Sequence, residues 1–111
     1  MKPLPPTLRD RRRYVAFEIA SSKVFSKKQV EKEINNVIFK ALGLFGFSNS
    51  GFWLVKYYEK QKAGIIRVNN DYLNLVLFAL GFFEKIENEK IVVKIIRVTG
   101  TVKKADSFIK K

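Results

Sequence analysis

The periodic part of the chain begins with an alternation of apolar and other positions. The chain alternates from Arg13 onward, with a large apolar residue at every second position from Val15 to Ile19, which predicts a half-buried β-strand. The residues on its apolar side are Val15, Phe17 and Ile19, and those on its other side are Tyr14, Ala16 and Glu18.

After Ser26 the apolar period changes to three and four residues, which predicts an amphipathic helix. Ser26 and Gln29 fit a capping box, in which each side chain satisfies a backbone N–H of the other residue. The apolar face consists of Val30, Ile34, Val37, Ile38 and Ala41. We expect Gly43 to end this helix and residues 43–51 to form a loop whose Phe45 and Phe47 fold back onto the core.

Two extended runs follow, Phe52 to Tyr58 and Ile65 to Asn69, and the polar residues between them predict a hairpin. Asp71 is a good N-cap for a second helix that ends near Gly81. Its expected buried stripe is Leu73, Val76, Leu77 and Leu80.

A last strand is predicted from Ile91 to Val98, after the polar turn ENEK. Both sides of this strand are mainly aliphatic. One side carries Val92, Lys94, Ile96 and Val98, and the other carries Ile91, Val93, Ile95 and Arg97. A short final helix could begin after Gly100, with Thr101 as its cap and Phe108 and Ile109 as anchors.

The order of elements predicts an α+β fold, namely a ferredoxin-like or RNA-recognition-like βαββαβ sandwich. Its four-stranded antiparallel sheet would carry both helices on one face, with a C-terminal helix added. The other face would be open unless something covers it. We expect one domain over residues 1–111, with a basic, proline-containing extended leader (1–11), an α/β core (12–99) and a basic tail or helix (100–111).

The charge of the chain indicates its partner. The 111 residues carry a formal net charge of +12, and 47% of them are hydrophobic, which suffices for a core. A folded basic module favours a polyanion, because lysine and arginine release the counterions condensed on phosphates. Nucleic acid is the first candidate and an anionic membrane surface the second.

The absence of Cys and His narrows the chemistry. Disulfides, thiolate nucleophiles, the usual zinc sites and histidine acid–base catalysis are excluded. The ten acidic residues are mostly interleaved with basic ones, which is typical of solvated faces rather than of a metal site. We therefore predict no catalytic and no metal-binding residue on this chain. With no signal peptide and no apolar run long enough for a bilayer, a cytoplasmic protein without a membrane partner is the simplest interpretation.

Four arginines stand directly before the first strand: Arg9, Arg11, Arg12 and Arg13. Arginine binds phosphate with two parallel hydrogen bonds, so RNA contact is one interpretation of this cluster. A solvated charge run is the other, with equal weight. For the tail lysines, which include Lys103 and Lys104, the residues alone favour solvation.

A base-stacking sheet is not favoured by the sequence. The predicted third strand, AGIIRVNN, lacks the aromatic residues of the RNA-recognition motif. Aliphatic residues on both sides of the last strand favour instead a protein partner or self-association on the open face. For Trp53, Tyr57 and Tyr58 we expect the core first and a stacking role second.

Three segments in order, LPPTLRDRRRYVAFEI, GIIRVN and IIRVTGTVKKA, resemble the archaeal ribonuclease P protein component two family, which is related to a eukaryotic subunit shared by ribonuclease P and ribonuclease MRP. The resemblance implies a subunit of the ribonucleoprotein that removes the 5′ leader of precursor tRNA. It further implies an active site on the RNA, which would use Mg²⁺. The implied partners are the ribonuclease P RNA, precursor tRNA through the complex, protein component three, and a second copy in a two-plus-two assembly.

Carried over by position, the resemblance suggests RNA contact for Arg9, Arg11, Arg12, Arg13, Arg67, Lys103 and Lys104. The apolar sheet face, with Tyr14, Trp53, Tyr58 and Ile96, would be a protein interface. One departure is the nearly uncharged second helix, NNDYLNLVLFALGFF, where the family carries basic residues. This helix therefore suits contact with a protein.

Two rival functions stay open. One is a stand-alone binding module for single-stranded RNA, which needs exposed aromatic residues on the sheet. The other is an independent nuclease that uses carboxylates and a divalent ion, which needs acidic residues that converge in space.

Overall fold

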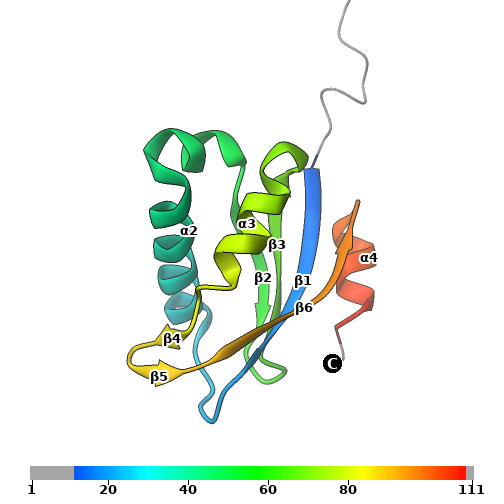
Figure 1. Ribbon diagram of the computed structural model, residues 1–111. Coiled ribbons are helices and arrows are strands. Elements are labelled where there is room, and N and C mark those ends of the chain that lie inside the picture. The colour runs from blue at the N-terminus through cyan, green and yellow to red at the C-terminus, as the bar shows by residue number, and fades with distance from the viewer. Residues whose placement is uncertain (1–11, 110–111) are drawn as a thin grey trace, which may run out of the picture.

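The computed structural model describes residues 12–109, and Arg9 and Arg11 lie outside this range. Its ten elements are β1 (Arg12–Ala20), α2 (Lys27–Ser50), β2 (Trp53–Tyr58), β3 (Ala63–Asn69), η1 (Asn70–Tyr72), α3 (Leu73–Leu80), β4 (Lys85–Ile86), β5 (Glu89–Lys90), β6 (Val92–Thr99) and α4 (Val102–Ser107). They form three layers, with α2 and α3 on one side of the sheet and α4 on the other (Figure 1).

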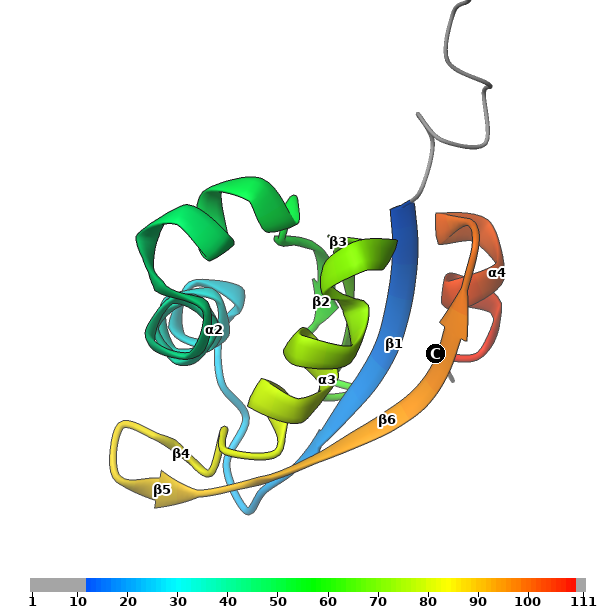
Figure 2. The ribbon, with the colours of Figure 1, turned by 45° about the horizontal axis from the view of Figure 1, so that its top comes forward.

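The main sheet has the strand order β2-β3-β1-β6. β1 pairs antiparallel with both β3 and β6, and β2 pairs antiparallel with β3. This is the predicted ferredoxin-like arrangement, in which the first strand lies in the centre. Figure 2 shows β1 between the layer of α2 and α3 and the layer of α4.

The main core lies between the sheet and the helices α2 and α3. β1 contributes Val15, Phe17 and Ile19, all at most 1% exposed, as its alternation predicts. From α2 come Val30, Ile34 and Ile38 of the expected face, whereas Ala41 of that face is exposed. From α3 come Val76 and Leu80 of the expected stripe, and also Ala79, which the stripe did not include. Leu73 and Leu77 of the predicted stripe are partly buried against the same core.

α2 begins as predicted and continues further than predicted. The Ser26 side chain accepts a hydrogen bond from the Gln29 N–H at 3.2 Å, and Gln29 Oε1 accepts one from the Ser26 N–H at 2.9 Å. Gly43, with φ +76° and ψ 177°, interrupts the helix, but a second helical segment follows and ends at Ser50, with Gly51 as its C-cap.

The expectation of a loop over residues 43–51 is therefore wrong beyond Gly43. A single left-handed glycine turns the chain and leaves the next residues free to return to the helical conformation. Phe47 packs on the core, where its ring contacts Phe39 and Phe52. Phe45, expected to fold back onto the core, is 81% exposed.

The second helix starts later than its sequence signal suggests. Residues 70–72 form a 3-10 turn that contains Asp71, and α3 begins at Leu73 without a side-chain cap. The assignment of Asp71 as N-cap is therefore wrong. A second unpredicted feature is the β4–β5 hairpin, whose turn residues Glu87 and Asn88 both have positive φ, as two-residue hairpin turns require.

A β-bulge interrupts the alternation of side chains in β6, so the predicted division of its residues between the two sides is wrong after Ile96. Ala16 pairs with Arg97 and Phe17 with Ile95, so that Ile96 is the extra residue. As a result Val93 and Val98, which the alternation placed on opposite sides, both pack against the main core. Ile96 packs instead in a second cluster, on the α4 side of the sheet.

Gly64 allows a close approach between β2 and β3. A Cβ at this position would lie 2.6 Å from the Lys56 carbonyl oxygen and 2.9 Å from Tyr57 Cδ1. Because the nearest atom is backbone, the strands would have to separate. We expect Gly64→Ala to lower the free energy of unfolding by about 1–3 kcal/mol, measured by denaturant titration. Gly100→Ala is the control, since its Cβ would meet no atom within 4 Å. Equal destabilisation by both substitutions would contradict this interpretation.

Tyr57 is buried with a hydroxyl that no described residue hydrogen-bonds. Burial, followed by the charge of Glu59, raises its pKa from 10 to about 12. The Tyr57 hydroxyl therefore stays protonated to a higher pH in the folded state than in the unfolded state. The part of the unfolding free energy that depends on this proton is fully present below pH 10 and is lost as the pH rises towards 12.

Tyr57→Phe should reduce this loss of unfolding free energy at alkaline pH by about 2 kcal/mol and change stability at pH 7 little. Denaturation of both proteins at several pH values tests this, and identical alkaline profiles would contradict it.

Candidate nucleic-acid interface

Of the four arginines in the N-terminal cluster, Arg12 and Arg13 are described, and they lie at the start of β1. Arg12 is exposed and pairs with Asn69 of β3, and Arg13 pairs with Val68. The Arg13 guanidinium donates to the Arg12 carbonyl oxygen at 2.9 Å. Since side chains alternate along a strand, Arg12 and Arg13 project on opposite sides of the sheet.

Three predicted site residues, Trp53, Arg67 and Tyr14, lie side by side on neighbouring strands and form one row across the sheet. Arg67 of β3 pairs with Trp53 of β2 on one side and with Tyr14 of β1 on the other, and Tyr14 pairs with Thr99 of β6. All three project on the side opposite α2 and α3, because the residues next to them in sequence belong to the main core. The Arg67 Nε donates to the Gly51 carbonyl oxygen at 3.3 Å, which orients its guanidinium.

α4 covers part of this side of the sheet. Its Ala105 and the following Ile109 are buried against Ala16, Ala63 and Ile65. The Tyr58 hydroxyl donates to Asp106 Oδ1 at 2.5 Å, and the Arg97 guanidinium lies 4.7 Å from the centre of the Phe108 ring. The Thr101 hydroxyl caps the helix at the Lys104 N–H, at 3.2 Å, as predicted.

α4 covers most of the residues that we expected to form a protein interface. Tyr14, Tyr58 and Ile96 are partly buried in the α4 cluster, so the chain itself occupies the face that we expected to be open. Trp53 lies beyond α4 and is 57% exposed, which contradicts the core position expected for it. Tyr57 is in the core, as expected.

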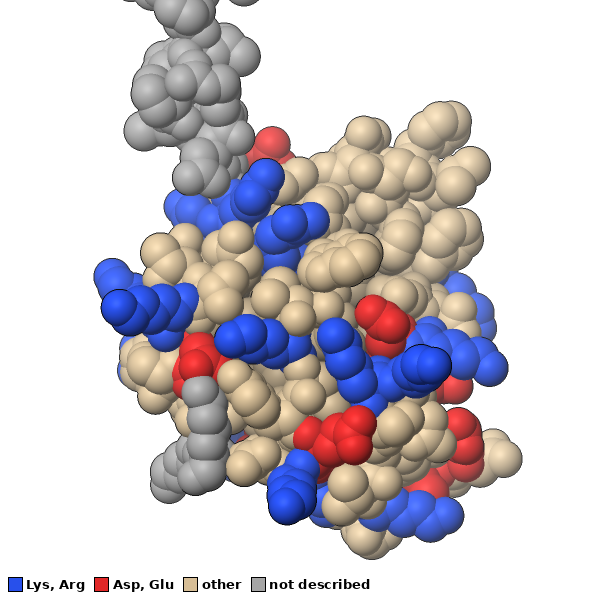
Figure 3. All heavy atoms as spheres, turned by 180° about the vertical axis from the view of Figure 1, so that it is seen from behind, with Lys and Arg blue, Asp and Glu red and all other residues tan. Residues whose placement is uncertain are grey.

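Basic side chains gather on the side of the molecule opposite the view of Figure 1. Lys and Arg form a band across the middle of Figure 3, in which Asp and Glu are fewer. Lys103 and Lys104 are exposed on α4, whose other side is fixed by Ala105. By strand alternation Arg12 and Arg67 project on the side of the sheet that α4 covers. The exposed Lys103 and Lys104 of α4 lie on this side too, although β1, β3 and α4 are far apart in the sequence.

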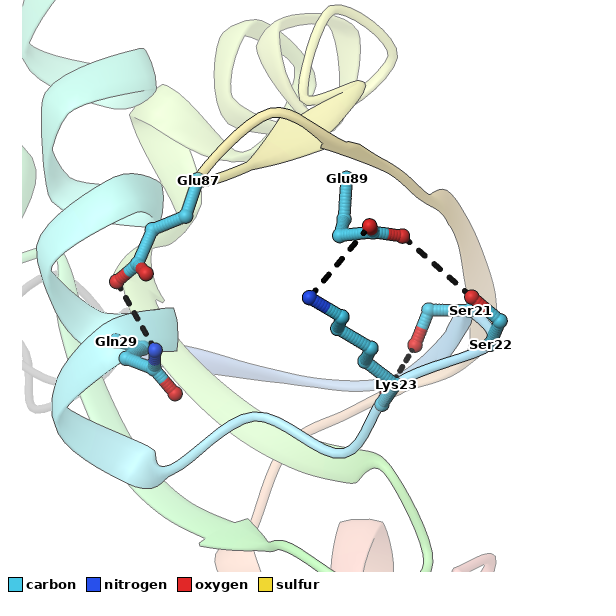
Figure 4. Close-up of polar contacts among 6 residues, drawn as sticks. All are labelled: Ser21, Ser22, Lys23, Gln29, Glu87 and Glu89. Carbon is cyan, nitrogen blue, oxygen red and sulfur yellow. Dashed lines mark hydrogen bonds and ion pairs between the residues drawn. The ribbon is translucent and has the colours of Figure 1, made fainter.

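The carboxylates near the β4–β5 hairpin serve structural contacts (Figure 4). Glu87 accepts a hydrogen bond from Gln29 Nε2 at 2.9 Å. Glu89 lies 3.6 Å from Lys23 Nζ and 3.5 Å from the Ser22 hydroxyl. Within residues 12–109, no three acidic side chains gather where they could hold a metal ion. Glu87 and Glu89 are thus both engaged with neighbouring polar side chains.

An apolar surface on the helix side was only partly predicted. A groove of about 550 Å³ between α2 and α3 is lined mainly by apolar residues, among them Leu75, Phe78 and Phe82. Phe78 and Phe82 are 68% and 62% exposed and contact each other edge to face. The sequence signal was the nearly uncharged second helix. No helix in the described part of the chain is long and apolar enough to cross a membrane.

Comparison with known proteins gives consistent matches along the chain. The model of the Rpp14/Pop5 family matches residues 13–110. "Ribonuclease P protein component 2" from Pyrococcus furiosus is 37% identical over 103 residues, which cover 93% of this chain and 86% of that protein. The protein of the same name from Methanococcus vannielii is 39% identical, with 93% of this chain and 78% of the relative covered.

A solved structure shares the fold. A chain in the cryo-EM structure of yeast ribonuclease MRP superimposes with a TM-score of 0.67 over 83% of this chain and 76% of its own length. With 15% sequence identity, this likeness shows a common architecture alone.

Proposed function

The chain belongs to the Rpp14/Pop5 family, and from this premise we infer that it is an RNA-binding, non-catalytic protein subunit of ribonuclease P. This ribonucleoprotein is the endoribonuclease that removes the 5′ leader of precursor tRNA. The observation that carries the inference is the similarity to archaeal ribonuclease P proteins over nearly the whole chain. The basic side of the sheet supports it.

In this function the chain binds and the RNA catalyses. The described acidic residues form no metal-binding group, and the chain has no His or Cys. We therefore assign the cleavage, and the Mg²⁺ that it needs, to the ribonuclease P RNA. The complex would act on precursor tRNA in the cytoplasm.

The basic residues at the start of β1 are suited to hold the RNA backbone. Arg12 and Arg13 pair with Asn69 and Val68 of β3, and from Tyr14 onward β1 also pairs with β6, so the sheet holds the backbone at the start of β1 in place. Phosphate contacts of this kind fix the position of an RNA and carry no sequence information. Arg9 and Arg11, which precede the described residues, would extend the same contact.

The apolar groove between α2 and α3 is suited to a protein. Phe78, Phe82 and Leu75 expose apolar surface there, and such patches are typical of interaction sites. We assign this groove to protein component three. The predicted two-plus-two assembly stays a prediction, and α4 leaves less of the sheet face for a contact between two copies.

The first test is cleavage of precursor tRNA by ribonuclease P RNA reconstituted with component three, with and without this chain. We expect the chain to raise cleavage activity.

Replacement of Arg11, Arg12 and Arg13 by Ala should lower this activity and reduce the salt dependence of RNA binding. The slope of the logarithm of the binding constant against the logarithm of the salt concentration should be smaller by about 0.7–0.9 for each phosphate that is no longer neutralised. The control, K28A/K32A/K60A, removes the same charge from exposed positions. If the wild-type chain leaves activity unchanged, the proposed function is wrong. If both triple variants behave alike, a specific role of Arg11, Arg12 and Arg13 in RNA binding is wrong.

The second test concerns the helix groove. Phe78→Glu places a charge in an exposed apolar surface, so it should weaken association with component three by tenfold or more, on the order of 1.4 kcal/mol, while the fold persists. Titration calorimetry with purified component three measures this. Val24→Glu is the control, because Val24 is 60% exposed in the β1–α2 loop, away from the groove residues. Unchanged affinity of the Phe78 variant would contradict the assignment.

A further inference from the structure

Trp53 is placed as an exposed aromatic platform on the basic side of the sheet. Its neighbours Phe52 and Leu54 are 7% and 2% exposed in the main core, which directs Trp53 to the opposite side. The indole is 57% exposed, and no described aromatic ring or cation packs on it. The protein thus leaves the largest flat side chain of its sheet accessible.

A fixed cation lies next to this platform. Arg67 pairs directly with Trp53, and adjacent strands are separated by about 4.8 Å. The hydrogen bond from Arg67 Nε to the Gly51 carbonyl oxygen orients the guanidinium. No described residue accepts a hydrogen bond from its two terminal nitrogens, which therefore remain available for a ligand.

The surroundings of Trp53 favour an anionic ligand. Arg12 lies one row further along the same side, opposite Asn69. The six positions of these two rows, Trp53, Arg67, Tyr14, Thr99, Arg12 and Asn69, include no acidic residue. On this side of β1 the acidic residue is Glu18, at the other end of the strand, opposite Ala63. A second copy of this basic chain would bring like charges together here, whereas a phosphate would complement them.

α4 limits the platform to one ring. It packs on β1, β3 and β6 through small residues such as Ala16 and Ala63. Tyr14 and Tyr58 are partly buried by the α4 cluster, and only Trp53 on the edge strand β2 lies clear of it. The surface therefore suits one flat ring rather than a run of stacked rings.

We propose that Trp53 and Arg67 form a binding site for one unpaired RNA nucleotide, whose base stacks on the indole and whose phosphate binds the guanidinium. The site rests on the RNA-binding function proposed above and adds to the phosphate contacts of the leader. Because every base has a flat face, the site would accept an unpaired nucleotide without strong preference for its identity.

The test uses the full chain and a single-stranded oligouridylate. Trp53 is the single tryptophan of the protein, so intrinsic fluorescence reports on this site directly. We expect the oligonucleotide to quench its emission with the same midpoint as binding measured by fluorescence anisotropy. Trp53→Ala should weaken binding about 5- to 100-fold, and Trp53→Phe, which retains a ring, should weaken it less. Arg67→Ala should weaken binding and lower the salt slope by about 1.

Phe45→Ala is the matched control, since it removes an 81% exposed aromatic side chain from α2, and it should bind as the wild type does. Circular dichroism and thermal melting verify that each variant is folded. Unchanged emission on binding, or equal affinity of the wild type and Trp53→Ala, would overturn the site. The same holds if Trp53→Ala changes self-association or binding of component three instead. Failure of the proposed function is a separate result, namely a wild-type chain that does not raise activity of the reconstituted enzyme.

Discussion

The structure depends on the burial of β1 on both of its faces. This strand pairs with β3 and β6, its Val15, Phe17 and Ile19 enter the main core, and its Ala16 enters the second cluster. A strand in this position cannot shift its register by one residue without exchanging the two faces. The start of β1, with Arg12 and Arg13, is therefore held in a fixed place relative to every other layer.

The second cluster decides which part of the sheet can meet a ligand. Small residues, Ala16, Ala63 and Ala105, let α4 lie close to the sheet. The helix thereby covers the central strands, on which RNA-recognition domains stack bases, and leaves Trp53 of the edge strand accessible. The same helix presents Lys103 and Lys104 to solvent beside the basic face. The packing of α4 on the sheet thus determines how much of the sheet face stays accessible, and it places two lysines beside that face.

The three layers separate two kinds of surface. The α4 side carries Arg67 and Trp53, whereas the α2–α3 side carries the exposed ring pair of Phe78 and Phe82. A polyanion and a protein could bind at the same time, since the sheet lies between their surfaces. This separation is what a protein that joins an RNA to another subunit requires.

The sequence by itself determined the order of the helices and of the main-sheet strands, the capping box at Ser26, most of the main core faces and the basic character of the chain, because these follow from local periodicity and composition. It failed where local signals compete with packing: helix after Gly43, the later start of α3, and the shift of Ile96 by a bulge. Tertiary structure alone decided that Arg67 lies between Trp53 and Tyr14, and that α4 covers Tyr58 but not Trp53. These relations join residues from different strands, and a one-dimensional pattern carries no information on which strands become neighbours or where a terminal helix docks.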